Sequence, residues 1–196
     1  MKLVPFRPAR HAEPAPTAGR FEALVLPHTD AAYRLALRLT RSPEAAEDVV
    51  HDGFLRALSH FESYRGGDIR AWLLSIVRNR AFDWLRERQR KATVALAPSD
   101  DPDTDMGWYP HDPNQETPEQ ALLRKGDAIS LNRLVDALPP RLREVLVLRE
   151  IEDLSYRQIA EITGSPIGTV MSRLARARSV VGEAWRRQQA VEAGRP

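Results

Sequence analysis

Aromatic and basic side chains are interleaved between residues 61 and 88. The aromatic residues are Phe61, Tyr64, Trp72 and Trp84, and the basic ones are Arg65, Arg70, Arg78, Arg80, Arg86 and Arg88. Aromatic rings can stack on unpaired bases, and guanidinium groups bind phosphates. The combination is typical of a surface for single-stranded nucleic acid. The two tryptophans fit a hydrophobic core better than a base platform, whereas Tyr64 lies in a glycine-rich segment and is the better candidate for stacking.

A helix-turn-helix is indicated at residues 155–178. In this motif a small residue lets two helices cross, a glycine four residues later makes the turn, and an apolar residue six further on anchors the second helix. Ala160, Gly164 and Val170 have this spacing, and the anchor begins an apolar stripe of Val170, Leu174, Ala177 and Val181. Burying that stripe turns outward a face with Thr169, Ser172, Arg173 and Arg176. Hydroxyls and guanidiniums can bind base edges and phosphates of duplex DNA, although a solvated arginine-rich face is the alternative.

A third candidate surface combines acidic, apolar and basic groups. Its members recur at i, i+4, i+7 and i+8 of one expected helix, and are Asp48, Asp52, Leu55 and Arg56. Residues with this spacing share one helix face, and such a mixture is typical of a helix that binds a protein partner. A solvated face with Leu55 in the core is the alternative.

Charge is unevenly distributed, although the formal net charge is only +2. Residues 65–91 contain eight Lys or Arg against three Asp or Glu, and residues 164–196 contain six against two. Between them, residues 92–120 contain seven Asp or Glu and no Lys or Arg. This pattern suggests two polyanion-binding surfaces joined by a tether that does not bind the same polyanion.

The elements that must position these residues are helices. Apolar residues recur at helical spacing and no alternating pattern indicates a strand, so we predict an all-α fold. Pro27 should interrupt a first helical segment at residues 21–40. Ser42 and Asp68 are expected N-caps of helices that run to about residue 60 and about residue 90. Further helices are expected at residues 117–137, 141–150 and 155–164 and after Ser165-Pro166, with capping boxes at Thr117 and Ser155.

These helices fall into two small domains joined by an acidic flexible linker. We expect a disordered basic tail at residues 1–20, a first domain at 21–91, the linker at 92–117 and a second domain at 118–190. Part of the linker has calcium-loop spacing, but Met106 replaces the required glycine, so no metal is expected. The chain has no cysteine, no catalytic constellation, no cofactor motif and no run of ~20 apolar residues, which favours a cytoplasmic protein that is not an enzyme and is not inserted into a membrane.

Both halves resemble the extracytoplasmic-function sigma factors of bacterial RNA polymerase. In the second half, LPPRLREVL at 138–146, DLSYRQIA at 153–160 and GTVMSRLARAR at 168–178 resemble region 4 of that family. In the first half, AEDVVHDGFLRA at 46–57 resembles region 2.2, and residues 64–79 resemble regions 2.3 and 2.4. The matches occur in the family's order and cover about residues 21–90 and 119–187.

The resemblance implies a factor that gives RNA polymerase its promoter specificity. It implies that core RNA polymerase binds to Asp48, Asp52, Leu55 and Arg56. It places the melted −10 element of promoter DNA around Phe61, Tyr64, Arg65, Gly66, Arg70, Asn79 and Arg80, where the Asn79 amide could recognise a flipped base. It places the duplex −35 element against Thr169, Met171, Ser172, Arg173, Ala175, Arg176 and Arg178. The linker would pass through the polymerase active-site cleft and RNA exit channel, and an anti-sigma factor is the expected regulator.

Two residues depart from the family's usual pattern, and three alternative functions have to be considered. Met171 stands where family members often carry a long polar residue, and Ala175 where many carry an aromatic one, so the −35 bases recognised should differ. An autonomous helix-turn-helix regulator would leave the first domain unexplained, and a sigma-like decoy should have lost its basic faces. A nuclease would need a metal-binding carboxylate cluster within a folded region.

Overall fold

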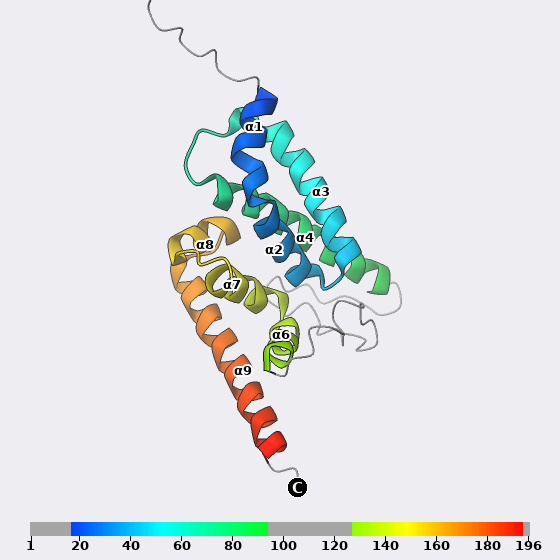
Figure 1. The fold of residues 1–196 in the computed structure, drawn as a ribbon, viewed down its shortest axis with the longest axis vertical. Coiled ribbons are helices and arrows are strands. Elements are labelled where there is room, and N and C mark those ends of the chain that lie inside the picture. The colour runs from blue at the N-terminus through cyan, green and yellow to red at the C-terminus, as the bar shows by residue number, and fades with distance from the viewer. Residues whose placement is uncertain (1–16, 94–126, 194–196) are drawn as a thin grey trace, which may run out of the picture.

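The computed structural model describes residues 17–93 and 127–193, and these residues form helices and no strands (Figure 1). The helices are α1 (Thr17–Val25), η1 (Leu26–His28), α2 (Thr29–Thr40), α3 (Pro43–His60), η2 (Phe61–Ser63), α4 (Ile69–Thr93), α6 (Asp127–Asp136), α7 (Pro140–Glu150), α8 (Tyr156–Thr163) and α9 (Ile167–Ala193). The all-α prediction is confirmed. Within the described ranges, no helix is both long enough and apolar enough to cross a membrane.

The expected helix boundaries of the first domain are confirmed by their hydrogen bonds. The 3-10 turn that contains Pro27 separates α1 from α2, as a proline that cannot donate a backbone hydrogen bond should. The Ser42 hydroxyl accepts from the Ala45 amide at 3.3 Å, so this serine caps α3. One carboxylate oxygen of Asp68 accepts from the Ala71 amide at 3.1 Å and caps α4 in the same way.

The first domain, α1 to α4, is built on the mutual packing of α2, α3 and α4. Their facing apolar residues are removed from solvent, among them Leu35, Leu39, Val49, Leu74 and Val77. The packing of α3 on α4 needs a residue without a side chain at position 53. A Cβ added to Gly53 would lie 2.9 Å from Cγ2 of Val77, so the two helices could not approach as closely with any other residue there.

The second domain, α6 to α9, contains the expected helix-turn-helix. Gly164 ends α8 in the left-handed conformation, with φ of +63°, and its amide donates to the Ala160 carbonyl. Val170, Leu174 and Ala177 of α9 are buried, which confirms the apolar stripe. Helix α6 packs against α9, which extends beyond the other helices as a single rod (Figure 1).

The predicted domain limits need one correction. The N-terminal tail was expected to include residues 17–20, but α1 begins at Thr17, so these four residues are helical. Helix α4 continues to Thr93, three residues past the expected end. Residues 1–16 of the expected tail, most of the linker and the capping box at residues 117–120 lie outside the described residues.

The close approach at Gly53 generates a stability prediction. We expect Gly53→Ala to lower the free energy of unfolding by about 1–2 kcal/mol, because overpacking at Val77 outweighs the gain in helix propensity. Urea denaturation measures the change. Gly182→Ala in α9 is the control, since a Cβ there meets no atom within 4 Å, and it should be neutral or slightly stabilising. Equal effects of the two substitutions would contradict the packing role of Gly53.

Candidate nucleic-acid interface

The loop between η2 and α4 presents the tyrosine that was predicted to stack on a base. The Tyr64 hydroxyl donates to the Gly67 carbonyl at 2.6 Å and closes the loop. Gly66 and Gly67 have φ of +96° and +104°, a conformation that other residues rarely adopt. Arg65 and Gly66 are exposed on the same loop. The glycine-rich segment with Tyr64 is therefore a loop, as the sequence indicated, and its role in stacking stays a prediction.

The aromatic residues around this loop form a cluster in which Tyr64 is the outer member. Phe61 is only 4% exposed, and its ring packs edge-on against Phe21 at 5.3 Å between centroids. The Tyr64 ring lies 6.1 Å from Phe61 and 5.3 Å from Trp72. Trp72 and Trp84 are half-buried and pack against the core, in line with the core interpretation of both tryptophans. Phe61 was predicted to belong to the −10 surface, but its ring is buried and stacks against the ring of Tyr64.

The remaining predicted −10 residues line α4, and several already have partners. Asn79 is exposed, and Nη1 of Arg78 donates to its amide oxygen at 2.9 Å. Arg80 donates to Asp52 at 2.6 Å and to Asp83 at 3.3 Å. Arg70 forms an ion pair with Glu152 of the second domain. The structure therefore brings Tyr64, Arg65 and Asn79 to the surface, but leaves Arg70 and Arg80 engaged.

Helix α3 carries the predicted polymerase surface on its solvent side. Asp48 and Arg56 are exposed, and Leu55 is 54% exposed, so the alternative that Leu55 lies in the core is wrong. Asp52 is half-buried and is tied to Arg80 of α4. Leu58, 45% exposed, lies one turn beyond Leu55, and sequence reasoning missed it. Its i+3 spacing from Leu55 was the available signal.

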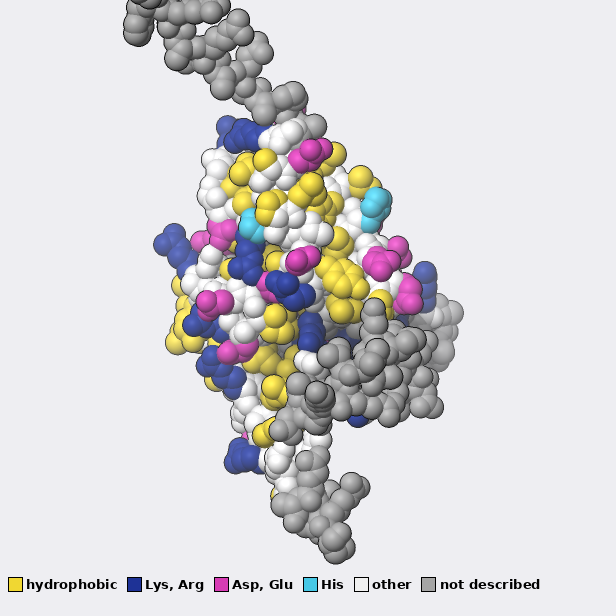
Figure 2. All heavy atoms as spheres, in the orientation of Figure 1, with side chains coloured by type: hydrophobic (Ala, Val, Ile, Leu, Met, Phe, Trp, Pro, Cys, Tyr) yellow, Lys and Arg dark blue, Asp and Glu magenta, His cyan; other side chains and the backbone are white. Residues whose placement is uncertain are grey.

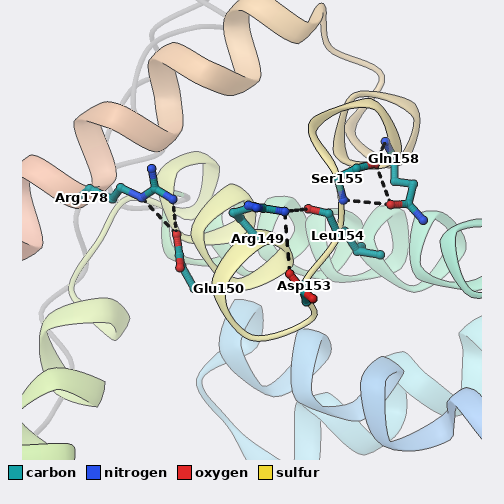
Figure 3. Close-up of polar contacts among 7 residues, drawn as sticks. All are labelled: Arg149, Glu150, Asp153, Leu154, Ser155, Gln158 and Arg178. Atoms are coloured by element: carbon teal, nitrogen blue, oxygen red, sulfur yellow. Dashed lines mark hydrogen bonds and ion pairs between the residues drawn. The ribbon is translucent and has the colours of Figure 1, made fainter.

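Hydrogen bonds stabilise the turn between α7 and α8, where the helix-turn-helix begins (Figure 3). Ser155 and Gln158 form the expected capping box: the Ser155 hydroxyl accepts from the Gln158 amide at 3.3 Å, and the Gln158 side chain accepts from the Ser155 amide at 2.8 Å. Nη1 of Arg149 donates to the Leu154 carbonyl at 2.8 Å. These bonds satisfy the polar groups where the chain turns into α8.

An ion pair joins α9 to the end of α7. Nη2 of Arg178 lies 2.6 Å from Oε1 of Glu150, as Figure 3 shows. The hydrogen bonds that Arg178 donates to Glu150 raise the pKa of the Arg178 guanidinium, which stays charged. Arg178, predicted to contact the −35 element, thus also orients α9 before any DNA is bound.

The outward face of α9 is available to a ligand. Met171 is 51% exposed, and Ser172, Ala175 and Arg176 are exposed as well. Thr169 is half-buried, and its carbonyl accepts from the Ser172 hydroxyl at 3.0 Å. Arg173 is half-buried at the flank, where Nη1 donates to the Ser165 hydroxyl at 3.2 Å. Arg176 is exposed, and among the described residues it has no hydrogen-bond or ion-pair partner.

Comparison with known proteins agrees with this division into two units. Residues 24–91 match the family Sigma-70 region 2, and residues 128–180 match Sigma-70, region 4. The chain is 32% identical over 165 residues to the RNA polymerase sigma-H factor of Pseudomonas aeruginosa, covering 84% of this chain and 85% of that protein. It is 36% identical over 159 residues to the ECF RNA polymerase sigma factor SigE of Mycolicibacterium smegmatis, covering 81% of this chain but only 58% of that protein.

Solved structures give the same result. The sigma factor RpoE, in its complex with the anti-sigma factor NepR from Bartonella quintana, aligns with a TM-score of 0.65 at 25% identity, over 85% of this chain and 97% of that one. CnrH, in its complex with the cytosolic domain of CnrY, shares the fold with a TM-score of 0.56 at 24% identity, over 91% of both chains. Regions 2 and 4 in one all-helical chain define a class of transcription factors, the sigma factors. The chain belongs to the extracytoplasmic-function family of RNA polymerase sigma factors.

Arg176 is exposed and Arg173 is half-buried, and this difference predicts that their alanine variants lose DNA binding in different ways. Arg176→Ala should weaken binding roughly 5- to 150-fold and relax preference at one −35 position, as loss of a contact to a base edge would. Arg173→Ala should weaken all sequences alike and lower the salt slope by about one, as loss of a phosphate contact would. Binding to a panel of −35 variants at several salt concentrations measures both, and indistinguishable profiles would refute the distinction.

Proposed function

We propose that this chain directs core RNA polymerase to promoters, with the first domain binding the melted −10 element and the second binding the duplex −35 element. One observation carries the proposal. A single chain presents an exposed loop carrying the half-buried Tyr64 and an exposed Asn79 on α4 in one domain, and an exposed face around Ser172 and Arg176 on a helix-turn-helix in the other. Stacking groups suit single strands, and an outward helix face suits the major groove. The chain acts with RNA polymerase, in the cytoplasm, as an initiation factor that is not itself an enzyme.

Promoter melting on this surface needs no catalytic residue. Extruding a base costs a few kcal/mol of unstacking and unpairing. Stacking on the Tyr64 ring and hydrogen bonds to the Asn79 amide are available only to a base that has left the duplex. Their binding energy therefore favours the melted state over the closed one; the loop between η2 and α4 supplies the Tyr64 ring and α4 supplies the Asn79 amide.

The exposed side of α3 is the proposed docking surface for core polymerase. Leu55 and Leu58 expose apolar area on the helix that also exposes Asp48 and Arg56, and protein interfaces combine apolar and charged groups in this way. The structural likeness to RpoE, which was solved with an anti-sigma factor, also supports control of this chain by a partner of that class.

Run-off transcription tests the proposed function against its alternatives. Core polymerase supplemented with the chain should initiate at promoters selected by the chain, and core alone should not. An autonomous regulator would bind duplex DNA without supporting transcription, and a decoy would do neither. Cleavage of the template would indicate a nuclease.

The docking surface predicts loss of polymerase binding without loss of duplex binding. Asp48→Arg with Leu55→Ala should reduce affinity for core polymerase by at least about tenfold, since it removes both charge complementarity and apolar area. Asp52 is left intact because its reversal would also disturb Arg80. Glu22→Arg, an equally exposed charge reversal on α1, is the control. Co-purification with core polymerase and duplex binding are measured, and retained polymerase affinity would remove the assignment.

The melting surface predicts a selective loss in the open complex. Tyr64→Ala and Asn79→Ala should reduce open-complex formation more than closed-complex binding, because both side chains contact bases only after melting. Permanganate reactivity measures melting, and gel mobility measures binding. Tyr64→Phe is the matched control, since it removes the bond to Gly67 but keeps the ring, and it should retain most of the melting. Equal losses in both assays would contradict the surface.

A further inference from the structure

Three apolar side chains lie in a row on the exposed side of α9, at its N-terminal end. Ile167 is 47% exposed, Met171 is 51% exposed, and Ala175 is exposed as well. Residues four apart on a helix lie on successive turns of the same side, so these three side chains form one continuous strip. We call these three residues the apolar ridge. On the face shown in Figure 2, hydrophobic and basic side chains adjoin at the left edge, where Figure 1 places the first turns of α9.

Packing within the chain does not account for the apolar ridge. The core side of α9 is the apolar stripe with Val170, Leu174 and Ala177, which are buried, and α9 packs there against α6, α7 and α8. The ridge lies beside this stripe and stays open to solvent. Single exposed apolar residues are common on protein surfaces, whereas exposed apolar residues that adjoin one another mark interaction sites more often. The ridge is therefore a candidate contact surface for a ligand.

The ridge occupies the part of a helix-turn-helix that enters the major groove of DNA. In this motif the N-terminal residues of the second helix contact the edges of base pairs. Helix α9 begins at Ile167, shortly after the turn at Gly164, so the ridge falls in its first turns. Gly168 is exposed, and a Cβ added to it would meet no atom within 4 Å. No described part of the protein therefore covers the surface beside Ile167.

Charge and polarity together indicate which group the ridge contacts. Residues 164–196 contain six Lys or Arg against two Asp or Glu, so the surroundings of the ridge favour a polyanion. Duplex DNA is a polyanion that also displays an apolar group in its major groove, the C5-methyl group of thymine. The ridge has no strong hydrogen-bonding group, since a methionine thioether accepts only weakly. Covering the amino group of cytosine or adenine would leave that group without a partner, which costs free energy. Thymine is therefore the base that the ridge fits best.

We propose that the apolar ridge determines the −35 specificity of this chain by binding the C5-methyl groups of thymines, with Met171 as the central contact. The inference rests on the proposed function and names the bases that the second domain selects. Successive members of the ridge are about 6 Å apart along α9, because each helical residue rises about 1.5 Å. Base pairs follow one another at about 3.4 Å. Met171 and Ala175 therefore reach thymines about two base pairs apart.

Replacement of thymine by uracil tests the proposal, because it removes one methyl group and leaves every hydrogen-bonding group of the base in place. Promoters selected from a random library by the full chain with core polymerase define the preferred −35 element. Each thymine of that element is then replaced by deoxyuridine, and binding of the chain with core polymerase is measured. At least one replacement should weaken binding about fourfold, which is the effect of withdrawing one methyl group from an apolar contact.

Substitutions of Met171 identify the protein side of the contact. Met171→Ala should abolish the difference in affinity between thymine and uracil at the sensitive position, because the methyl group then has no partner. Met171→Leu keeps an apolar side chain of similar size and should keep the difference. Met171→Gln keeps the length but adds hydrogen-bonding groups, so it should lose the difference and shift the preference towards adenine. Val180→Ala is the matched control: it shortens a side chain of α9 that is 44% exposed but lies outside the ridge, and it should leave the difference unchanged.

The outcomes distinguish the thymine contact from the function on which it rests. A selected −35 element without thymine would overturn the proposal, and so would uracil replacements that are all neutral. A loss that persists in Met171→Ala at every sensitive position would overturn it as well, since the methyl group would then act without the ridge. In these three cases run-off transcription from the selected promoters leaves the proposed function standing. If the chain with core polymerase selects no promoter, both the proposed function and the thymine contact are wrong.

Discussion

The burial of two carboxylates between the domains is the constraint on which the arrangement of this chain depends. Removing a carboxylate from water costs several kcal/mol unless cations and hydrogen bonds compensate. Glu144 and Glu152 have no exposed side-chain surface, and three of the cations paired with them, Arg34, Arg70 and Arg78, belong to the other domain, while Arg141 of the same helix lies 3.7 Å from Glu144. If the domains separate, water or a ligand must therefore solvate or bind both the carboxylates and the arginines.

Local features of this fold could be predicted because short-range physics determines them. Ser42, Asp68 and Ser155 cap helices, since each places an oxygen beside amides that would otherwise lack partners. The apolar stripe of α9 followed from helical periodicity, and its burial turned Arg176 outward. The error at the start of α1 has the same origin, because the basic, proline-rich segment before residue 20 gives no periodic signal.

Contacts between distant segments could not be predicted in this way. No prediction was made for Glu144 or Glu152, because the residues next to them in sequence do not indicate that Arg78 and Arg34, far away along the chain, are their partners. Phe61 was assigned to the −10 surface, yet it is buried and its ring stacks against that of Tyr64. Composition predicted a surface of aromatic and basic residues for nucleic acid. Which of these residues are exposed to solvent depends on tertiary packing, which composition does not give.

Salt weakens contacts of the first domain with nucleic acid more than its buried ion pairs with the second domain. Binding of nucleic acid by arginines weakens steeply as the salt concentration rises, because the release of condensed counterions into solution then gains less entropy. Buried ion pairs such as that of Glu144 with Arg78 are screened much less, since ions do not enter the interface. Rising ionic strength therefore weakens the binding of DNA while the contacts between the domains persist. The ion pair of Asp52 with Arg80 links the α3 surface to α4, where the melted strand is proposed to bind.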